Sequence, residues 1–103
     1  MIARHWKGIA KPEMATAYET HLLKETFPSL LRIKGFIKAF ILKRNVTDGT
    51  EFLIITEWDS LLSIKAFAGE DVGVSVVPQA VREMMVSYDD KAVHYEIAKE
   101  FNR

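Results

Sequence analysis

The chain has 103 residues, of which 14 are basic, 14 are acidic and none is cysteine. A chain of this length predicts one domain, while the balanced charge excludes the strong field that draws nucleic acid or an anionic membrane, and the absent cysteines exclude disulfides and thiolate chemistry. Because the sequence shows neither a secretion signal nor an apolar run of the about 18 residues that a membrane span needs, we expect a cytoplasmic protein.

The first third of the chain predicts a strand followed by a helix. Residues 2–7 form a β-type stretch that Gly8 ends. Pro12 then opens a helix, since its missing N–H is not needed in the first turn. Pro28 removes a helical hydrogen bond further along, so this helix should kink or end near Phe27.

Two further strands are predicted over 36–44 and 51–58. The segment between them contains Asp48-Gly49, a strong hairpin signal, so these strands should be antiparallel neighbours. After the second of them, Asp59 is expected to cap a helix. A hairpin is thus expected to lead directly into a second helix.

The second helix should end at Gly69, and residues 69–78 predict a loop. Pro78 opens a further helix, in which apolar residues recur at helical spacing as far as Tyr88. Residues 92–97 alternate apolar and polar side chains, the pattern of a last strand. This segment contains the last element that the sequence predicts.

The predicted elements follow the order β-α-β-β-α-β, with an extra helix before the last strand. This is the split β-α-β order of the ferredoxin-like α+β fold, with one antiparallel four-stranded sheet and helices on one face. We expect a single domain over 1–98 and a frayed tail over 99–103. In this order the first and last strands are neighbours in the sheet.

Both faces of the predicted sheet carry apolar side chains, because residues alternate along a strand. In the first strand of the hairpin, Phe36, Phe40 and Leu42 lie on one side and Ile37, Ala39 and Ile41 on the other. In the second strand, Phe52, Ile54 and Trp58 lie on one side and Leu53 and Ile55 on the other. One helical layer covers only one face, so we expect a second copy of the chain on the other, in a two-fold homodimer.

Six segments of the sequence resemble the antibiotic biosynthesis monooxygenase family of dimeric α/β-barrel proteins. They are MIARHWKG, IKGF, LKR, FLIITEWDSLLSIKAFAGED, VVPQA and VHYEI. The resemblance implies a homodimer of ferredoxin-like subunits whose sheets form a barrel with a pocket in each subunit. It also implies one of several activities, among them cofactor-free oxygenation of aromatic polyketides, quinol oxidation and haem degradation.

The haem-degrading branch of that family is the activity that the sequence disfavours. Aligned on the Trp-x-Ser segment at 58–60, the branch needs an asparagine, a tryptophan and an iron-ligating histidine where this chain has Lys7, Phe67 and Val77. All three residues differ. We therefore expect no haem and no other cofactor.

His94 is the leading candidate for a general base, with His5 and Arg4 on the neighbouring strand. His94 and Glu96 share a face, and a carboxylate beside an imidazole would raise its basicity. Which of Arg4 and His5 lies opposite them depends on strand register. A surface or interface role for the pair stays open, and two ligands on one strand are weak evidence for a metal site, so none is expected.

The remaining candidates would line an apolar pocket for a small aromatic molecule. They are Trp58, Phe36, Phe40, Phe52 and Tyr95. With one base and with Arg4 to stabilise an anion, such a pocket suffices for a cofactor-free monooxygenase acting on a quinol, an anthrone or a polyketide-like ring. The alternative is a non-catalytic or stress-related dimer that binds an apolar ligand. His21 falls on the apolar stripe of the first helix, which favours a core or interface position.

Overall fold

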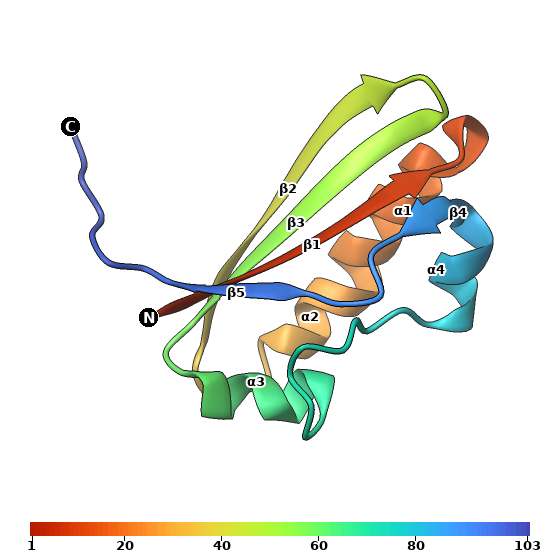
Figure 1. The fold of residues 1–103 in the computed structure, drawn as a ribbon. Helices are drawn as coiled ribbons and strands as arrows, with labels where there is room; N and C mark the ends of the chain where they lie inside the picture. The colour runs from red at the N-terminus through yellow and green to blue at the C-terminus, as the bar shows by residue number, and fades with distance from the viewer.

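An antiparallel sheet forms the centre of the computed structural model, which describes all 103 residues (Figure 1). Its long strands are β1 (Ile2–Ala10), β2 (Phe36–Val46) and β3 (Gly49–Trp58), in the order β2-β3-β1. The short strands β4 (Met85–Tyr88) and β5 (Val93–Glu96) share the other edge of β1. The sheet is therefore four positions wide, as expected, but its fourth position is divided between two strands.

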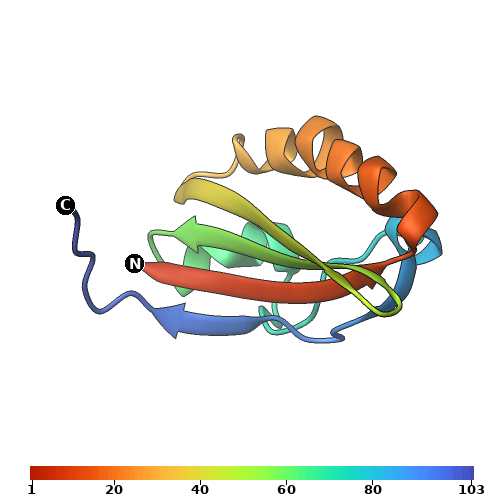
Figure 2. The same cartoon turned by 90° about the horizontal axis from the view of Figure 1, so that it is seen from above.

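The helices lie on one side of this sheet and pack on alternate residues of β3. The first helical segment comprises η1 (Pro12–Met14), α1 (Ala15–His21), η2 (Leu22–Thr26) and α2 (Phe27–Leu30), and it runs along the sheet in Figure 2. The others are α3 (Leu61–Ala68) and α4 (Gln79–Met84). The ferredoxin-like α+β fold is confirmed, and none of its helices is long and apolar enough to span a membrane.

The buried core forms two clusters under β3. Phe52 and Ile54 pack with Tyr18 from α1 and with residues of α4, whereas Trp58 packs with Leu30 and Ile64. Phe52, Ile54 and Trp58 thus mark the face of the sheet that the helices cover, which we call the helix face. Residues in register across antiparallel strands share a face, so the pairing lists assign every other strand residue to the helix face or to the opposite, open face.

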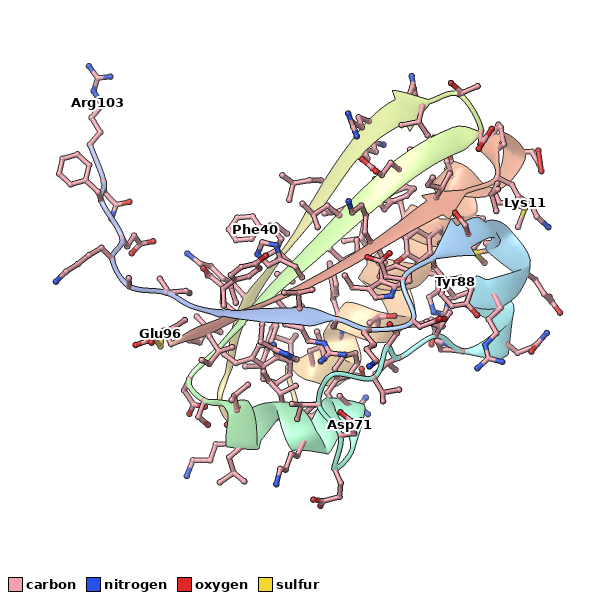
Figure 3. All side chains as sticks on the ribbon, in the orientation of Figure 1. Lys11, Phe40, Asp71, Tyr88, Glu96 and Arg103 are labelled. Atoms are coloured by element: carbon pink, nitrogen blue, oxygen red, sulfur yellow. The ribbon has the colours of Figure 1, made fainter.

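A bulge in β2 changes the predicted assignment of its side chains to the two faces. Phe36 pairs with Trp58 on the helix face, but the register shifts between Phe36 and Lys38. Phe40 consequently pairs with Ile55 on the open face, and Figure 3 shows it projecting away from the helices. The prediction that Phe36 and Phe40 share a face is wrong, because a bulge inverts strict alternation.

Gly8 lies inside β1 and does not end it as predicted. The strand continues to Ala10. A Cβ on Gly8 would lie 2.7 Å from Cη2 of Trp6, so the glycine makes room for the indole ring two residues earlier on the same face. Gly8, which was predicted to end the strand, instead leaves space within the strand for the large side chain of Trp6.

Of the two predicted outcomes near Phe27, a kink or an end, the end is wrong, because the first helical segment continues through Pro28 to Leu30. Leu22–Thr26 forms a π-turn, in which the N–H of Phe27 donates to the carbonyl of Leu22. A π-turn widens the helix locally and often occurs where the ordinary bonding pattern is interrupted. The proline is accommodated by this wider turn.

The hairpin is confirmed, with a two-residue turn at Thr47 and Asp48 and longer strands than predicted. Gly49, expected in the turn, is instead paired with Val46 as the first residue of β3. The strands extend to the turn itself because they form one continuous antiparallel ladder from Val46 back to the bulge near Phe36.

Ser60, rather than Asp59, caps α3. Its hydroxyl oxygen accepts a hydrogen bond from the N–H of Ser63 at 3.3 Å. Asp59 accepts instead from the hydroxyl groups of Ser63 and Ser60, at 2.5 and 3.0 Å, and these bonds lower the pKa of its carboxyl group. Gly69 ends the helix as predicted, with φ of 88°.

The predicted helix after Pro78 is shorter than its apolar spacing indicated. It ends at Met84, and residues Met85–Tyr88 form β4, which pairs with the end of β1. On the edge of β1 away from β3, the backbone groups of this part would otherwise lack partners, because β5 pairs only with Ile2–His5. Pairing with β1 therefore determines the conformation of Met85–Tyr88, although apolar residues recur there at helical spacing.

Candidate functional site

A cavity of about 60 Å³ lies between the helix face of the sheet and the first helical segment. Of the 13 residues that line it, 9 are hydrophobic. Trp6, Tyr18 and Leu22 belong to its apolar wall, and Arg4 and Thr56 supply polar groups from the sheet. We call this space the inner cavity. It is an apolar enclosure with a few fixed polar groups, the usual composition of a small-molecule site.

A second space, of about 230 Å³, adjoins the inner cavity on the outside. His21, Glu25 and Ser29 line this outer pocket from the first helical segment. Both spaces share four residues, which form a neck between them. These are Thr26, Phe67, Val76 and Pro78. The polar outer pocket and the apolar inner cavity are therefore adjoining spaces with a common wall.

Strand register places Arg4 at the centre of the sheet, between Thr56 on β3 and His94 on β5. Its side chain is only 4% exposed. One guanidinium nitrogen donates to the carbonyl of Val72 and, at 2.9 Å, to Nε2 of His94. The other terminal nitrogen donates to the carbonyl of Val74 at 2.9 Å. Since arginine has five N–H donors, two of them have no partner within the chain.

No carboxylate pairs with Arg4. The ion pairs of the chain all lie at the surface and involve other residues. Burial lowers the pKa of Arg4 from its usual value, the direction expected when a cation is removed from water without an opposite charge. A buried cation without an anionic partner is destabilising, which makes an anionic ligand favourable at this point.

His94 is neutral in this arrangement and holds Arg4 in place. Arginine only donates, so Nε2 of His94 must be the acceptor, and the ring proton is on Nδ1. Burial, together with the charge of Arg4, lowers the pKa of His94. The prediction that Glu96 raises the basicity of His94 is therefore wrong, because Arg4 is the residue bonded to the imidazole.

Tyr18 and Thr56 add neutral hydrogen-bonding groups to the inner cavity. Burial strongly raises the pKa of the Tyr18 phenol, so its hydroxyl stays protonated. Every fully buried side-chain oxygen and nitrogen has a hydrogen-bond partner, whereas the Tyr18 hydroxyl bonds no group of the chain. This hydroxyl is therefore not fully buried but open to the cavity that Tyr18 lines. Thr56 accepts a hydrogen bond from Nε1 of Trp58 at 2.8 Å, which leaves its own hydroxyl proton free.

Three of the predicted pocket residues, Trp58, Phe36 and Phe52, pack against residues that line the inner cavity but do not line it themselves. Trp58 is fully buried, and its ring packs on Phe36 at 5.3 Å and stacks on Phe67 at 6.2 Å. Phe52 contacts the ring of Tyr18 edge to face, at 4.9 Å between centroids. These aromatic residues fix Thr56, Phe67 and Tyr18 without reaching the cavity themselves.

Three other predicted site residues lie on the open face of the sheet. Phe40 pairs with Ile55, whereas His5 and Tyr95 contact each other with ring centroids 5.1 Å apart. None of them lines the inner cavity. Of the predicted catalytic residues, the structure thus brings Arg4 and His94 together and separates His5 from both.

Sequence reasoning missed Tyr18, Thr56 and Phe67 as cavity residues. Trp6 also lines the cavity, and it shares a face with Arg4 by simple alternation along β1. That alternation was the one available signal. Tyr18 and Phe67 come from two different helices, so only the tertiary fold brings them to the cavity.

The inner cavity does not fit a haem group. Neither this cavity, at about 60 Å³, nor the adjoining outer pocket, at about 230 Å³, reaches the roughly 300 to 1,000 Å³ of ordinary cofactor and ligand sites. Tyr18 is the inner cavity's one side chain of a type that ligates haem iron, and burial disfavours the phenolate. Val77 is buried in the core, and Lys7 alternates onto the open face.

Comparison with known proteins gives a family match and several similar folds. The model of the antibiotic biosynthesis monooxygenase family matches residues 1–72. No curated protein matches the chain. A candidate antibiotic biosynthesis monooxygenase from Bacillus cereus has 14% identity and a TM-score of 0.70, over 100% of this chain and 96% of that one.

Two further solved structures share the fold. A candidate antibiotic biosynthesis monooxygenase from Deinococcus radiodurans has 16% identity and a TM-score of 0.68, over 100% of this chain and 98% of that one. The haem degrader MhuD from Mycobacterium tuberculosis, with two haems bound in its active site, has 15% identity and a TM-score of 0.62, over 99% of this chain and 100% of that one. Because the family model covers well over half of its length, the chain belongs to the antibiotic biosynthesis monooxygenase family, as its sequence predicted.

Proposed function

We propose that the chain is a cofactor-independent monooxygenase that acts on a small aromatic hydroxy compound of the quinol, anthrone or polyketide type. The observation that carries this proposal is the guanidinium of Arg4, buried without a carboxylate partner beside an apolar cavity. A fixed cation in a water-poor site stabilises an oxyanion strongly. Membership of the monooxygenase family supports oxygen as the second substrate.

The substrate anion supplies the electrons for the reaction. Arg4 holds the oxyanion, and the hydroxyl groups of Tyr18 and Thr56 are available to orient it. The activated ring carbon of the anion reduces dioxygen and forms a C–O bond to it, which gives a peroxide that takes up one proton. Loss of water from the hydroperoxide then breaks the O–O bond and the remaining C–H bond of the same carbon, which becomes a carbonyl. One oxygen atom stays in the product and the other leaves as water.

We further propose that the protein is a homodimer whose two sheets pack through their open faces. Four apolar side chains of this face are each between 45% and 55% exposed, and they come from two separated strands. They are Phe40, Leu42, Val93 and Tyr95. Large apolar side chains exposed on both edges of one sheet face favour an interface that covers this face. The proposed active site lies on the helix face, so each subunit carries its own.

The test is oxygen uptake with a panel of quinols and anthrones, combined with ¹⁸O₂ labelling of the product. We expect substrate-dependent uptake of one O₂ per turnover and one labelled oxygen in the product. Tight binding of the same compounds without oxygen uptake would instead assign the chain to the non-catalytic ligand-binding class.

A further inference from the structure

The inner cavity contains no group that can take a proton from a ligand. Its only titratable side chains are Arg4 and Tyr18. Arginine does not act as a base in proteins, and burial keeps the phenol of Tyr18 protonated. Every polar side chain around the cavity therefore donates to a ligand or remains neutral.

The three histidines of the chain do not supply the missing base. The acceptor nitrogen of His94 is occupied by Arg4, and His5 lies on the opposite face of the sheet. His21 lines the outer pocket with Glu25, beyond the neck formed by Phe67 and its neighbours. A hydroxyl group that reaches Arg4 must therefore have lost its proton already.

We propose that the inner cavity takes its ligand already ionised, and that the substrate is a vinylogous acid, an enol conjugated to a carbonyl group that is about as acidic as a carboxylic acid. This rests on the proposed function and narrows its substrate class. A simple phenol with a pKa of about 10 is only roughly one part in a thousand ionised at neutral pH, whereas an acid with a pKa of about 4 is fully ionised.

The sizes of the two spaces indicate how such a ligand lies. The inner cavity, at about 60 Å³, is smaller than the roughly 150 Å³ apolar cavity that accommodates benzene. It therefore receives the enolate end, while the ring extends past Phe67 and Pro78 into the outer pocket of about 230 Å³. The ligand is thus elongated, with its negative charge at the buried end and its bulk toward solvent.

The test is calorimetric binding under argon with 2-hydroxy-1,4-naphthoquinone, its O-methyl ether and 1-naphthol. The first is a vinylogous acid, the second is its neutral isostere and the third is a weak phenol. At neutral pH the acid should bind about tenfold or more tightly than the ether, as expected for a charge-assisted hydrogen bond. Its affinity should fall as the pH drops through the pKa of the ligand, and binding should release no proton to the buffer.

Two variants identify where the anion binds. Arg4→Gln should remove the preference for the acid over the ether, with circular dichroism confirming the fold, whereas His21→Gln should leave it unchanged. Equal affinity of the wild-type protein for acid and ether overturns the proposal. So does tight binding of 1-naphthol with release of one proton, because the protein then deprotonates its ligand. Loss of the preference in His21→Gln also overturns it, because the anion is then held in the outer pocket and not at Arg4.

Anaerobic binding and oxygen uptake separate this inference from the proposed function. If the acid binds with the expected preference but no acid of its class supports oxygen uptake, the proposed oxygenation fails and the binding inference stands. If simple quinols are oxygenated while the acid shows no preference over its ether, the inference fails and the oxygenation stands.

Discussion

The guanidinium of Arg4 is a buried cation whose partners in the chain carry no negative charge. Two backbone carbonyls and the neutral imidazole of His94 hold it, and two of its donors remain unused. A group of this kind costs stability, so its position beside an apolar cavity is explained better by ligand binding than by folding. The chemistry we assign to the protein begins with this side chain.

Protonation of His94 should weaken both the fold and the site. Its pKa in the folded protein is lowered from 6.5, first by burial and then by the charge of Arg4. Below pH 6.5 the unfolded chain then binds more protons than the folded chain, so the contribution of His94 is complete above that pH and is lost as the pH falls through the lower folded pKa. The melting temperature should therefore fall on acidification below pH 6.5.

His94→Gln is the variant that isolates this effect. A glutamine oxygen can still accept from Arg4 but does not titrate, so this variant should lose less melting temperature between pH 6.5 and 5 than the wild type does. His94→Leu removes the acceptor and should weaken anion binding at every pH. Identical pH profiles of melting for the wild type and His94→Gln would show that His94 does not titrate as described.

Short local interactions at the ends of elements set the shape of the cavity. The π-turn Leu22–Thr26 carries Leu22 in the cavity wall and Thr26 in the neck, and it ends immediately before α2. On β1, Gly8 leaves room for Trp6, whose Nε1 donates to the carbonyl of Asp89 at 2.9 Å. Changes at such points should alter the site without touching its polar groups.

Gly8→Ala tests the link between β1 and the cavity wall. The new Cβ would meet the ring of Trp6 at 2.7 Å, so the indole must shift. Overpacking of this kind costs about 1 to 3 kcal/mol. We expect a lower urea midpoint and a changed tryptophan emission spectrum. An unchanged spectrum with unchanged stability would contradict the close contact.

Ser60→Ala tests the cap of α3, the helix that carries Phe67. Loss of the Ser60 hydroxyl removes the hydrogen bond to the N–H of Ser63, and an N-cap of this type contributes about 1 kcal/mol. Urea denaturation should show that loss. Ser87→Ala, at an exposed strand position, is the matched control and should stay within about 0.5 kcal/mol of the wild type. Equal effects of the two substitutions would contradict the assignment of the cap to Ser60.

At the scale of the whole molecule, the sheet separates two functions between its faces. The helix face carries the inner cavity, and the open face carries exposed apolar side chains around Phe40 and Tyr95. In the homodimer that we propose, the second face is covered while both cavities stay accessible from the helical side. Assembly and chemistry then depend on different residues of the same strands.

Phe40→Glu should disrupt the proposed dimer, because it places a charge among the exposed apolar side chains of the open face. In analytical ultracentrifugation at micromolar concentration we expect a dimer for the wild type and a monomer for this variant. Leu62→Glu is the control, since Leu62 is 73% exposed on α3, away from the open face, and this variant should remain dimeric. A monomeric wild type would contradict the proposal.

The sequence predicted the strands, the hairpin and the split β-α-β order because these depend on local patterns of apolar residues and turns. The bulge after Phe36 and the change from helix to strand at Met85 were not predictable in this way, since each depends on pairing with a distant strand. Arg4 was predicted as a site residue, but its hydrogen bond to His94 depends on the register of β1 and β5, which the alternation of side chains does not determine. The cavity joins residues from several elements and needed the tertiary structure.

The central claim is that Arg4 holds the anion that reacts with oxygen. Steady-state oxygen uptake by Arg4→Gln, compared with Arg44→Gln, tests it most directly. Arg44 pairs with Glu51 at the surface and lines neither the inner cavity nor the outer pocket. Loss of an oxyanion-stabilising donor costs about 10² to 10³ in rate. We predict a loss of that size in kcat/KM for Arg4→Gln, with the fold retained, and little change for Arg44→Gln. Equal oxygen uptake by the two variants would contradict the account.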